Sequence, residues 1–175
     1  MKNAAHRKSQ TEDLGAGDAV DHAQLFPLFK TMMPYQAQIL ARMMQNDYIA
    51  RIADTGIAPA QAYLLGELWF DEPLSQVELA RRLDIGKATI GQTLNRLERA
   101  GVIERRRVAS DRRVIMIHLT EKGRSLREPL AAATELQMNA LKKIIGEAEL
   151  AQLTELLIRA TTKLRAALPK EIVQE

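Results

Sequence analysis

Three side chains between residues 89 and 96 have the types and the spacing of a surface that reads nucleic acid. Thr89, Gln92 and Arg96 follow one another at steps of three and four residues, so on a helix they form one stripe. Hydroxyl, amide and guanidinium groups are those that contact base edges and phosphates in a major groove. We call these three residues the reading face. The alternative interpretation is an ordinary exposed polar face. The apolar stripe of the same helix consists of Ile90, Leu94 and Leu97.

The start of this helix and the segment that follows it carry further basic groups. Lys87 lies at the helix N-terminus, where free backbone N–H groups and the helix dipole favour phosphate. In the next segment, Arg105 and Arg107 alternate onto one face of a strand and Arg106 points to the other. Arg112 and Arg113 follow at the tip of the hairpin or the start of its return strand, within reach of the DNA backbone or the minor groove.

An acidic residue, Asp111, stands inside this basic loop. We expect it to orient an arginine or to accept hydrogen bonds from the N–H groups of the turn. The full set of candidate DNA-binding residues is Ser75, Lys87, Thr89, Gln92, Thr93, Arg96, Arg105, Arg107, Asp111, Arg112 and Arg113.

The charge distribution supports a polyanion-binding segment. The chain has a formal net charge of only +3, but residues 81–124 contain twelve basic and five acidic residues, a net charge of +7. The rest of the chain is therefore mildly acidic, with a net charge of −4. A basic block in such a molecule indicates a face that binds a polyanion, although a solvated charged surface has the same composition.

The elements that position these groups begin with a capped helix. Ser75 is a good N-cap, Glu78 stands three residues later, and Leu74 and Leu79 occupy the N′ and N4 positions. This combination of capping box and hydrophobic staple predicts a helix over residues 76–83. A turn over residues 84–86 separates it from a second helix over 87–100, which Gly101 ends. Two short helices joined by a glycine-containing turn form a helix-turn-helix.

Beyond Gly101 the periodicity changes from 3.6 to 2. Residues 102–107 and 113–119 are rich in β-branched or alternating side chains and predict a hairpin, which makes the unit a winged helix-turn-helix. The rest of the chain predicts helices over residues 21–33, 35–54, 59–71, 121–145 and 147–168, with Pro129 as a kink or restart in the fourth.

The segment from Leu83 to Gly123 resembles the MarR family. The resemblance lies in N-R-L-E-R-A-G-V-I-E-R over residues 95–105, in S-D-R-R over 110–113, similar to the SlyA branch, and in L-T-E-K-G over 119–123. It implies that Asp111 and Arg113 take the family's wing salt-bridge and minor-groove roles. It also implies a homodimer, formed by the terminal helices, that places two recognition helices on successive turns of a pseudo-palindromic operator in double-stranded DNA.

The expected fold class is mainly α, a winged helix-turn-helix with a small β-hairpin wing and N- and C-terminal dimerisation helices. The expected organisation is a disordered tail over residues 1–20, N-terminal dimerisation helices that form a pocket wall over 21–56, the DNA-binding domain over 57–120, and C-terminal dimerisation helices over 121–175.

Many members of this family release DNA when a small, often aromatic, anion binds between the dimerisation helices and the winged domain. In this chain, Arg42 is a lone cation in the apolar stretch 32–44 and could hold a carboxylate. A plain core stripe, with Arg42 paired to an acid across the dimer, is the alternative. The candidate ligand-binding residues are Tyr35, Ile39, Arg42, Met43 and Tyr63, and the candidate effector is a small aromatic carboxylate.

Other function classes find less support. The chain has no Cys, and its three His residues are scattered, so we expect no catalytic site, no metal site and no cofactor. It contains no apolar run of a length that spans a membrane and no secretion signal, so we expect a cytoplasmic protein without a membrane partner. The remaining alternative is an architectural protein that binds DNA of any sequence without an effector, because a net charge of +7 supplies non-specific affinity.

Overall fold

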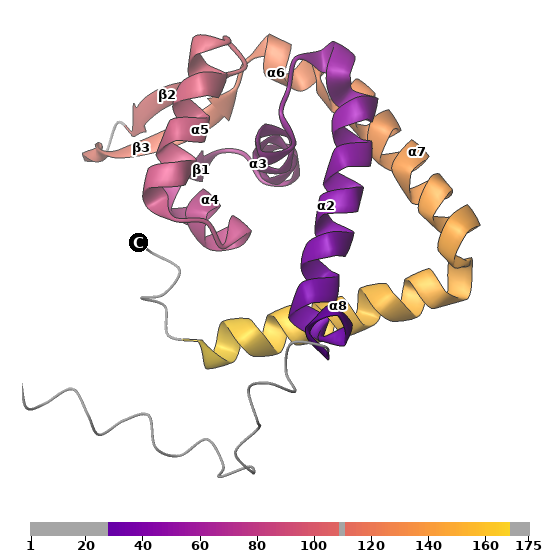
Figure 1. The fold of residues 1–175 in the computed structure, drawn as a ribbon. Helices are drawn as coiled ribbons and strands as arrows, with labels where there is room; N and C mark the ends of the chain where they lie inside the picture. Colours follow the sequence, from indigo (N-terminus) through magenta and orange to yellow (C-terminus); the bar gives the residue numbers. More distant parts are fainter. Residues whose placement is uncertain (1–27, 109–110, 169–175) are drawn as a thin grey trace, which may run out of the picture. The chain divides into compact units, whose positions relative to one another are not determined.

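The computed structural model describes residues 28–108 and 111–168. The elements are two short 3-10 helices, η1 (Phe29–Thr31) and η2 (Ala53–Thr55), the α-helices α2 (Met33–Ile52), α3 (Pro59–Phe70), α4 (Gln76–Leu83), α5 (Lys87–Arg99), α6 (Glu121–Ser125), α7 (Arg127–Ile145) and α8 (Glu147–Ala167), and the strands β1 (Leu74–Ser75), β2 (Ile103–Val108) and β3 (Asp111–Leu119). The fold is the predicted mainly helical, winged helix-turn-helix arrangement (Figure 1).

Glycine and proline set the bounds of the helices before the helix-turn-helix. The helix predicted over residues 35–54 is α2 followed by η2, and Gly56 ends it with a φ of +68°, in the left-handed region. Pro59 is the first residue of α3. Of the short helix predicted over residues 21–33, the part up to residue 27 lies outside the described residues, as does the predicted N-terminal tail. The described remainder contains the single turn η1.

Helices α3, α4 and α5 surround one apolar core (Figure 1). The apolar stripe predicted for α5 is buried, with Ile90 2% exposed and Leu94 and Leu97 fully buried. Leu79 from α4 and Leu68 from α3 are also fully buried in this core. Because α5 packs through this stripe, its opposite side faces away from the core.

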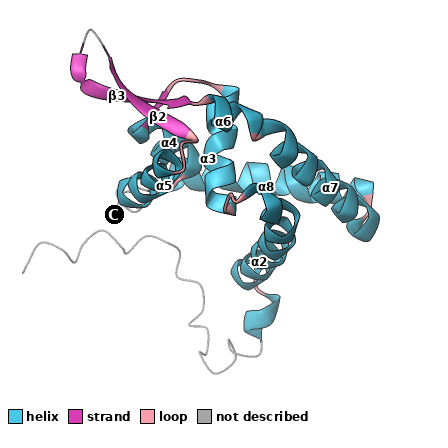
Figure 2. Ribbon diagram, turned by 90° about the horizontal axis from the view of Figure 1, so that it is seen from above, coloured by secondary structure: helices cyan, strands magenta, loops and turns pink. Residues whose placement is uncertain are grey.

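The sheet has three antiparallel strands in the order β1-β3-β2. Strands β2 and β3 form the predicted hairpin, which we call the wing, and it extends away from helices α3 to α6 (Figure 2). Strand β1 has only two residues and is not predicted from the sequence. It pairs Leu74 with Ile117 and Ser75 with Met116, so the start of α4 is attached to the base of the wing.

The chain leaves the wing through a break in the helix that the sequence predicts over residues 121–145. The break lies at Leu126, between α6 and α7, and Pro129 occupies the first turn of α7, where its missing N–H costs nothing. Helix α7 leads away from α6, and α8 then returns so that its C-terminal end lies beside α4 (Figure 1). Within the described ranges, no helix combines the length and apolar character needed to cross a bilayer.

Candidate nucleic-acid interface

Helix α4 supports the recognition helix α5 and is fixed at its N-terminus by Ser75. The Ser75 side chain accepts a hydrogen bond from the backbone N–H of Glu78 at 3.1 Å, and Leu74 and Leu79 of the hydrophobic staple are both buried. The predicted cap is therefore present. The reciprocal half of the capping box is not, because the Glu78 carboxylate binds arginines of its own helix instead. Ser75 stays a predicted DNA contact.

An ion-pair network around Arg82 holds α4 against α3. The Arg82 guanidinium donates to Glu78 at 2.9 Å and to Asp71 at 2.6 Å, and Glu67 lies 3.5 Å away. Hydrogen bonds from Arg81 first, and from Arg82 second, lower the pKa of Glu78 to about 2. This network is not predicted from the sequence, although the spacing of Glu78, Arg81 and Arg82 is that of helical ion pairs.

The reading face is exposed on α5. The side chains of Thr89, Gln92 and Arg96 face solvent, and none of them makes an ion pair or hydrogen bond with another described residue. The Lys87 side chain, in the first turn of the same helix, is equally free of described partners, while its backbone oxygen accepts a bond from the Gln76 amide. The side chains of Lys87 and of the three reading-face residues are thus available on α5 for hydrogen bonds to another molecule.

Thr93 differs from these four residues. Its hydroxyl donates to the backbone oxygen of Thr89 at 3.0 Å, and its side chain is half-buried. The hydroxyl oxygen can still accept a hydrogen bond.

The loop between α4 and α5 begins at Asp84, which adopts a left-handed φ of 51° and is the C-cap of α4. Gly86 is the N-cap of α5 and makes no side-chain hydrogen bond there.

The arginines of the wing have different surroundings. Arg105 pairs with Glu98 and donates to Asn95 at 2.9 Å, so its guanidinium is held by α5. Arg106 pairs with Glu104 on its own strand. Arg107 is exposed and has no ion-pair partner among the described residues. Both Arg105 and Arg107 stay predicted contacts. Of the two, Arg107 can reach a phosphate without giving up a bond to another described residue.

The predicted tip residues cannot be placed in the same way. The backbone of Asp111, Arg112 and Arg113 belongs to β3, but their side chains lie outside what the structure describes. The predicted roles of these three residues at the wing stay predictions.

The segment after the wing closes the C-terminal end of α5. Thr120 caps α6 by accepting from the Gly123 N–H, and its hydroxyl lies 2.7 Å from the Gly101 oxygen, to which it donates. The Lys122 ammonium donates to the Ala100 oxygen at 2.9 Å. The L-T-E-K-G segment thus binds the carbonyl groups that the end of the recognition helix leaves free.

A second network, absent from the sequence analysis, fixes the base of the wing. Glu72 accepts two bonds from Arg124, at 2.6 and 3.0 Å, and one from the Leu119 N–H at 2.9 Å. Burial raises the pKa of Glu72, but the bonds from Arg124 and Leu119 outweigh that effect, and the net pKa lies below its ordinary value. The pair links residues 52 positions apart in the chain.

The predicted ligand-binding residues lie on two helices. On α2, Tyr35 packs edge-on against Phe29 with ring centroids 5.2 Å apart, Ile39 is half-buried, and Arg42 and Met43 are exposed. On α3, Tyr63 stacks on Tyr48 at 6.3 Å. The described residues contain no group of three or more His, Asp or Glu side chains that could hold a metal ion. The ligand-binding roles stay predictions.

Comparison with known proteins agrees with the winged helix-turn-helix fold described above. The model of the MarR family matches residues 55–114. The uncharacterized HTH-type transcriptional regulator YdgJ of Bacillus subtilis (strain 168) is 30% identical over 127 residues, which are 71% of this chain and 77% of that protein.

Two solved structures share the fold. BpsR of Bordetella bronchiseptica, whose DNA binding is regulated by 6-hydroxynicotinic acid, is 21% identical, with a TM-score of 0.71 over 76% of this chain and 95% of that one. The transcriptional repressor CouR, bound to a 23-mer DNA duplex, is 26% identical, with a TM-score of 0.69 over 77% of this chain and 95% of that one.

Proposed function

Because the chain belongs to the MarR family of DNA-binding transcription regulators, we propose that it is a homodimeric repressor that releases its operator when a small aromatic carboxylate binds. The observation that carries the proposal is the unpartnered reading face on α5. Helix α5 has 13 residues and is about 20 Å long, a size that a major groove admits. The side chains that face away from its buried stripe are those that can bond to base edges.

The groups around the reading face supply phosphate contacts. Lys87 stands at the N-terminus of α5 and Arg107 on the wing, so they flank the reading face from two elements. Phosphate contacts of this kind fix register on the duplex and carry no sequence information themselves. Side chains that can read bases and side chains that can bind phosphate are therefore both present, as expected for a sequence-specific protein. The DNA-bound structure of the 26% identical repressor CouR supports this proposal of DNA binding.

The C-terminal helices support dimer formation. Helix α8 has 21 residues, of which only Leu150 is buried within the described chain, while Leu157 and Ile158 are 46% and 60% exposed. On α7, Leu136 is 58% exposed. Apolar surface of this extent on neighbouring helices is typical of a protein–protein interface. A second copy of the chain is the proposed occupant.

The proposed effector is a small aromatic acid. Arg42 offers an exposed guanidinium that could hold its carboxylate. The regulation of BpsR by 6-hydroxynicotinic acid, itself an aromatic carboxylic acid, supports this class of ligand.

The decisive experiment compares DNA fragments. Fluorescence anisotropy at physiological salt should measure the Kd for a palindromic fragment from upstream of the regulated genes and for random DNA of the same length. A regulator that reads sequence should prefer the palindrome by about 10³-fold or more. Near-equal affinities would favour the architectural alternative, and an aromatic acid that leaves specific binding unchanged would remove the effector from the proposal.

A further inference from the structure

The recognition helix has one line of side chains that points most directly away from its buried stripe. At roughly 100° per residue, the direction opposite the stripe is that of Ala88, Gln92 and Arg99. All three side chains are exposed. We call these three residues the outer line. Gln92 also belongs to the reading face, whereas Ala88 and Arg99 are not among the predicted DNA contacts.

The outer line lies between the two parts of the molecule that contact the duplex in the proposed function. On one side of it, Asn95 and Glu98 hold Arg105 of the wing. On the other side lie Thr89 and Arg96 of the reading face. A duplex that engages the wing and the reading face together therefore rests on the outer line.

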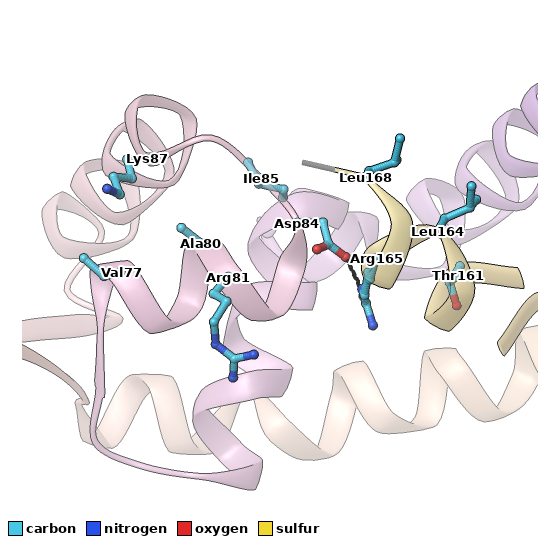
Figure 3. Close-up of a pocket in the computed structure, with 10 residues that line it drawn as sticks. All are labelled: Val77, Ala80, Arg81, Asp84, Ile85, Lys87, Thr161, Leu164, Arg165 and Leu168. Atoms are coloured by element: carbon cyan, nitrogen blue, oxygen red, sulfur yellow. Dashed lines mark hydrogen bonds and ion pairs between the residues drawn. The ribbon is translucent and has the colours of Figure 1, made fainter. Parts of the chain in front are cut away.

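Helix α8 leaves the outer line open. A cavity of about 570 Å³ lies between α4 and the last turns of α8, and Figure 3 shows the Lys87 side chain, at the start of α5, pointing away from its apolar wall. None of the outer-line residues borders this cavity. The contact of α8 is with the turn before α5, where the Arg165 Nε donates to Asp84 at 2.6 Å. The face that carries Ala88 is therefore free for a partner outside the chain.

The surroundings of Ala88 allow a base edge to come close. Three positions further along the helix stands Gly91, which has no side chain. The Gln76 amide donates to the Lys87 backbone oxygen at 3.1 Å and lies 3.2 Å from the place that a Cβ atom of Gly91 would take. Gln76 is thus held at the first turn of α5, and Ala88 stays exposed beside it. A side chain as short as that of alanine touches a base only where the surface around it is low, as it is here.

Ala88 and Gln92 have the chemistry that reads an A·T pair. The Gln92 amide makes no hydrogen bond with any part of the chain that the structure describes, and such an amide can bond to N6 and N7 of adenine in the major groove. The Ala88 methyl group has no polar atom and matches the 5-methyl group of thymine. The two residues are four positions apart, about 6 Å along the helix, which is about two base-pair steps.

We propose that Ala88 determines specificity by packing its methyl group against the 5-methyl group of a thymine. This thymine lies within about two base pairs of an adenine that Gln92 binds. The inference rests on the proposed function, because it needs a duplex seated on α5, and it adds a feature that each operator half-site must contain. A cytosine at the same place has no methyl group, so the apolar contact is lost.

The test uses uracil, which differs from thymine by this methyl group alone and also pairs with adenine. Each thymine of the operator fragment is replaced in turn by uracil, in both half-sites, and the Kd of the full chain is measured by fluorescence anisotropy at constant salt. The wild type should lose about 10-fold at one such position, since burial of one methyl group is worth about 3- to 4-fold and the proposed dimer makes the contact twice.

Ala88→Gly removes the methyl group on the protein side. This variant should bind the thymine operator more weakly than the wild type does, and it should bind the thymine and uracil operators equally at the sensitive position. Because both operators are compared on the same protein, a loss of helix stability caused by glycine cancels. Ala100→Gly, at the other end of the helix and outside the outer line, is the matched control and should keep the wild-type ratio.

Gln92→Ala locates the adenine. The adenine whose replacement by 7-deaza-adenine weakens the wild type but not Gln92→Ala should lie within about two base pairs of the sensitive thymine.

Three results would overturn the inference. They are a wild type that no uracil replacement weakens, an Ala88→Gly protein that keeps the wild-type ratio at every thymine, and a sensitive thymine far from the adenine that Gln92 binds. The preference of the wild type for the operator over random DNA is measured separately. A protein that keeps this preference but ignores the methyl group disproves the role of Ala88 alone, whereas equal binding to operator and random DNA disproves the proposed function.

Discussion

Arg105 on the wing donates a hydrogen bond to the side-chain oxygen of Asn95 on the recognition helix at 2.9 Å. The same guanidinium pairs with Glu98, one turn further along α5, and the exposed fraction of the Arg105 side chain is 22%. The angle between the wing and the reading face is therefore fixed by a contact between side chains as well as by the backbone. A duplex that engages both elements at once requires such a fixed relation.

Arg105 and Arg107 should therefore respond differently to substitution. Arg105→Ala is expected to lower the melting temperature by a few degrees and to weaken operator binding, because the wing loses its attachment to α5. Arg107→Ala should leave the melting temperature unchanged and reduce the slope of log K against log salt by about 1, as loss of one phosphate contact does. Thermal unfolding and salt-dependent anisotropy measure both effects. If Arg105→Ala changes only the salt slope, Arg105 contacts DNA and does not position the wing.

The stability of the molecule should depend on pH through Glu78. Hydrogen bonds from Arg81 and Arg82 lower its pKa from 4.5 to about 2 in the folded chain. Since the folded pKa is the lower one, the ionised carboxylate stabilises the fold above pH 4.5 and this contribution is lost as the pH falls towards 2. The effect is small because solvent reaches both Glu78, whose side chain is 32% exposed, and Arg81, whose side chain is 71% exposed.

Glu78→Gln removes this contribution. Its melting temperature should lie below that of the wild type at pH 6, and the difference should shrink as the pH is lowered towards about 2.5. Glu128→Gln, on the surface of α7, is the control. A difference that stays constant from pH 6 to 2.5 would show that the ionisation of Glu78 does not stabilise the fold.

Gly123 allows the segment after the wing to approach the end of α5. A Cβ atom at this position would lie 2.2 Å from the backbone oxygen of Val102, a distance that no real contact has. Gly123→Ala should therefore lower the free energy of unfolding by about 1–3 kcal/mol, measured by urea denaturation. Gly66, inside α3, has open space around it, and Gly66→Ala should be neutral or stabilising by up to about 1 kcal/mol. Equal effects of the two substitutions would contradict the close approach at Gly123.

Ile158 on α8 tests the proposed dimer. Its side chain is 60% exposed in the single chain, so Ile158→Glu should leave the fold intact but place a charge in the interface. Sedimentation should then show a monomer at concentrations where the wild type is a dimer, and removal of residues 150–175 should have the same effect. Lys163→Glu, which changes an already charged residue of the same helix, should not change the oligomeric state. A dimer that survives Ile158→Glu would exclude this face.

The sequence predicted the helix-turn-helix well because local signals determine it. The cap at Ser75 and the apolar staple predict the start of α4 at the residue observed, and the change of period after Gly101 predicts the wing. Strand β1 could not be predicted, since two residues show no period. Pro129, which the sequence predicts as a kink or restart, lies in the first turn of α7, and the break itself lies at Leu126.

The contacts that position the candidate site could not be predicted from the sequence. Arg82 reaches Asp71 from 11 positions away, and Glu72 reaches Arg124 from 52, so the fold must be known before these pairs can be recognised. The exposure of the reading face followed from helical periodicity alone. The engagement of Arg105 by α5 spans only 7 to 10 positions, but it depends on how the wing is placed against that helix.

The most direct test of the central claim, that α5 reads base edges through Arg96 in the major groove, uses an operator in which single purines are replaced by their 7-deaza analogues. These analogues remove the N7 acceptor and leave base pairing intact. The wild type should lose about 5- to 150-fold in affinity at one guanine per half-site, which corresponds to 1–3 kcal/mol for one bidentate contact. Arg96→Ala should bind more weakly and be insensitive at that guanine. An unchanged wild-type affinity at every purine, or a sensitivity profile that Arg96→Ala leaves intact, would contradict the account.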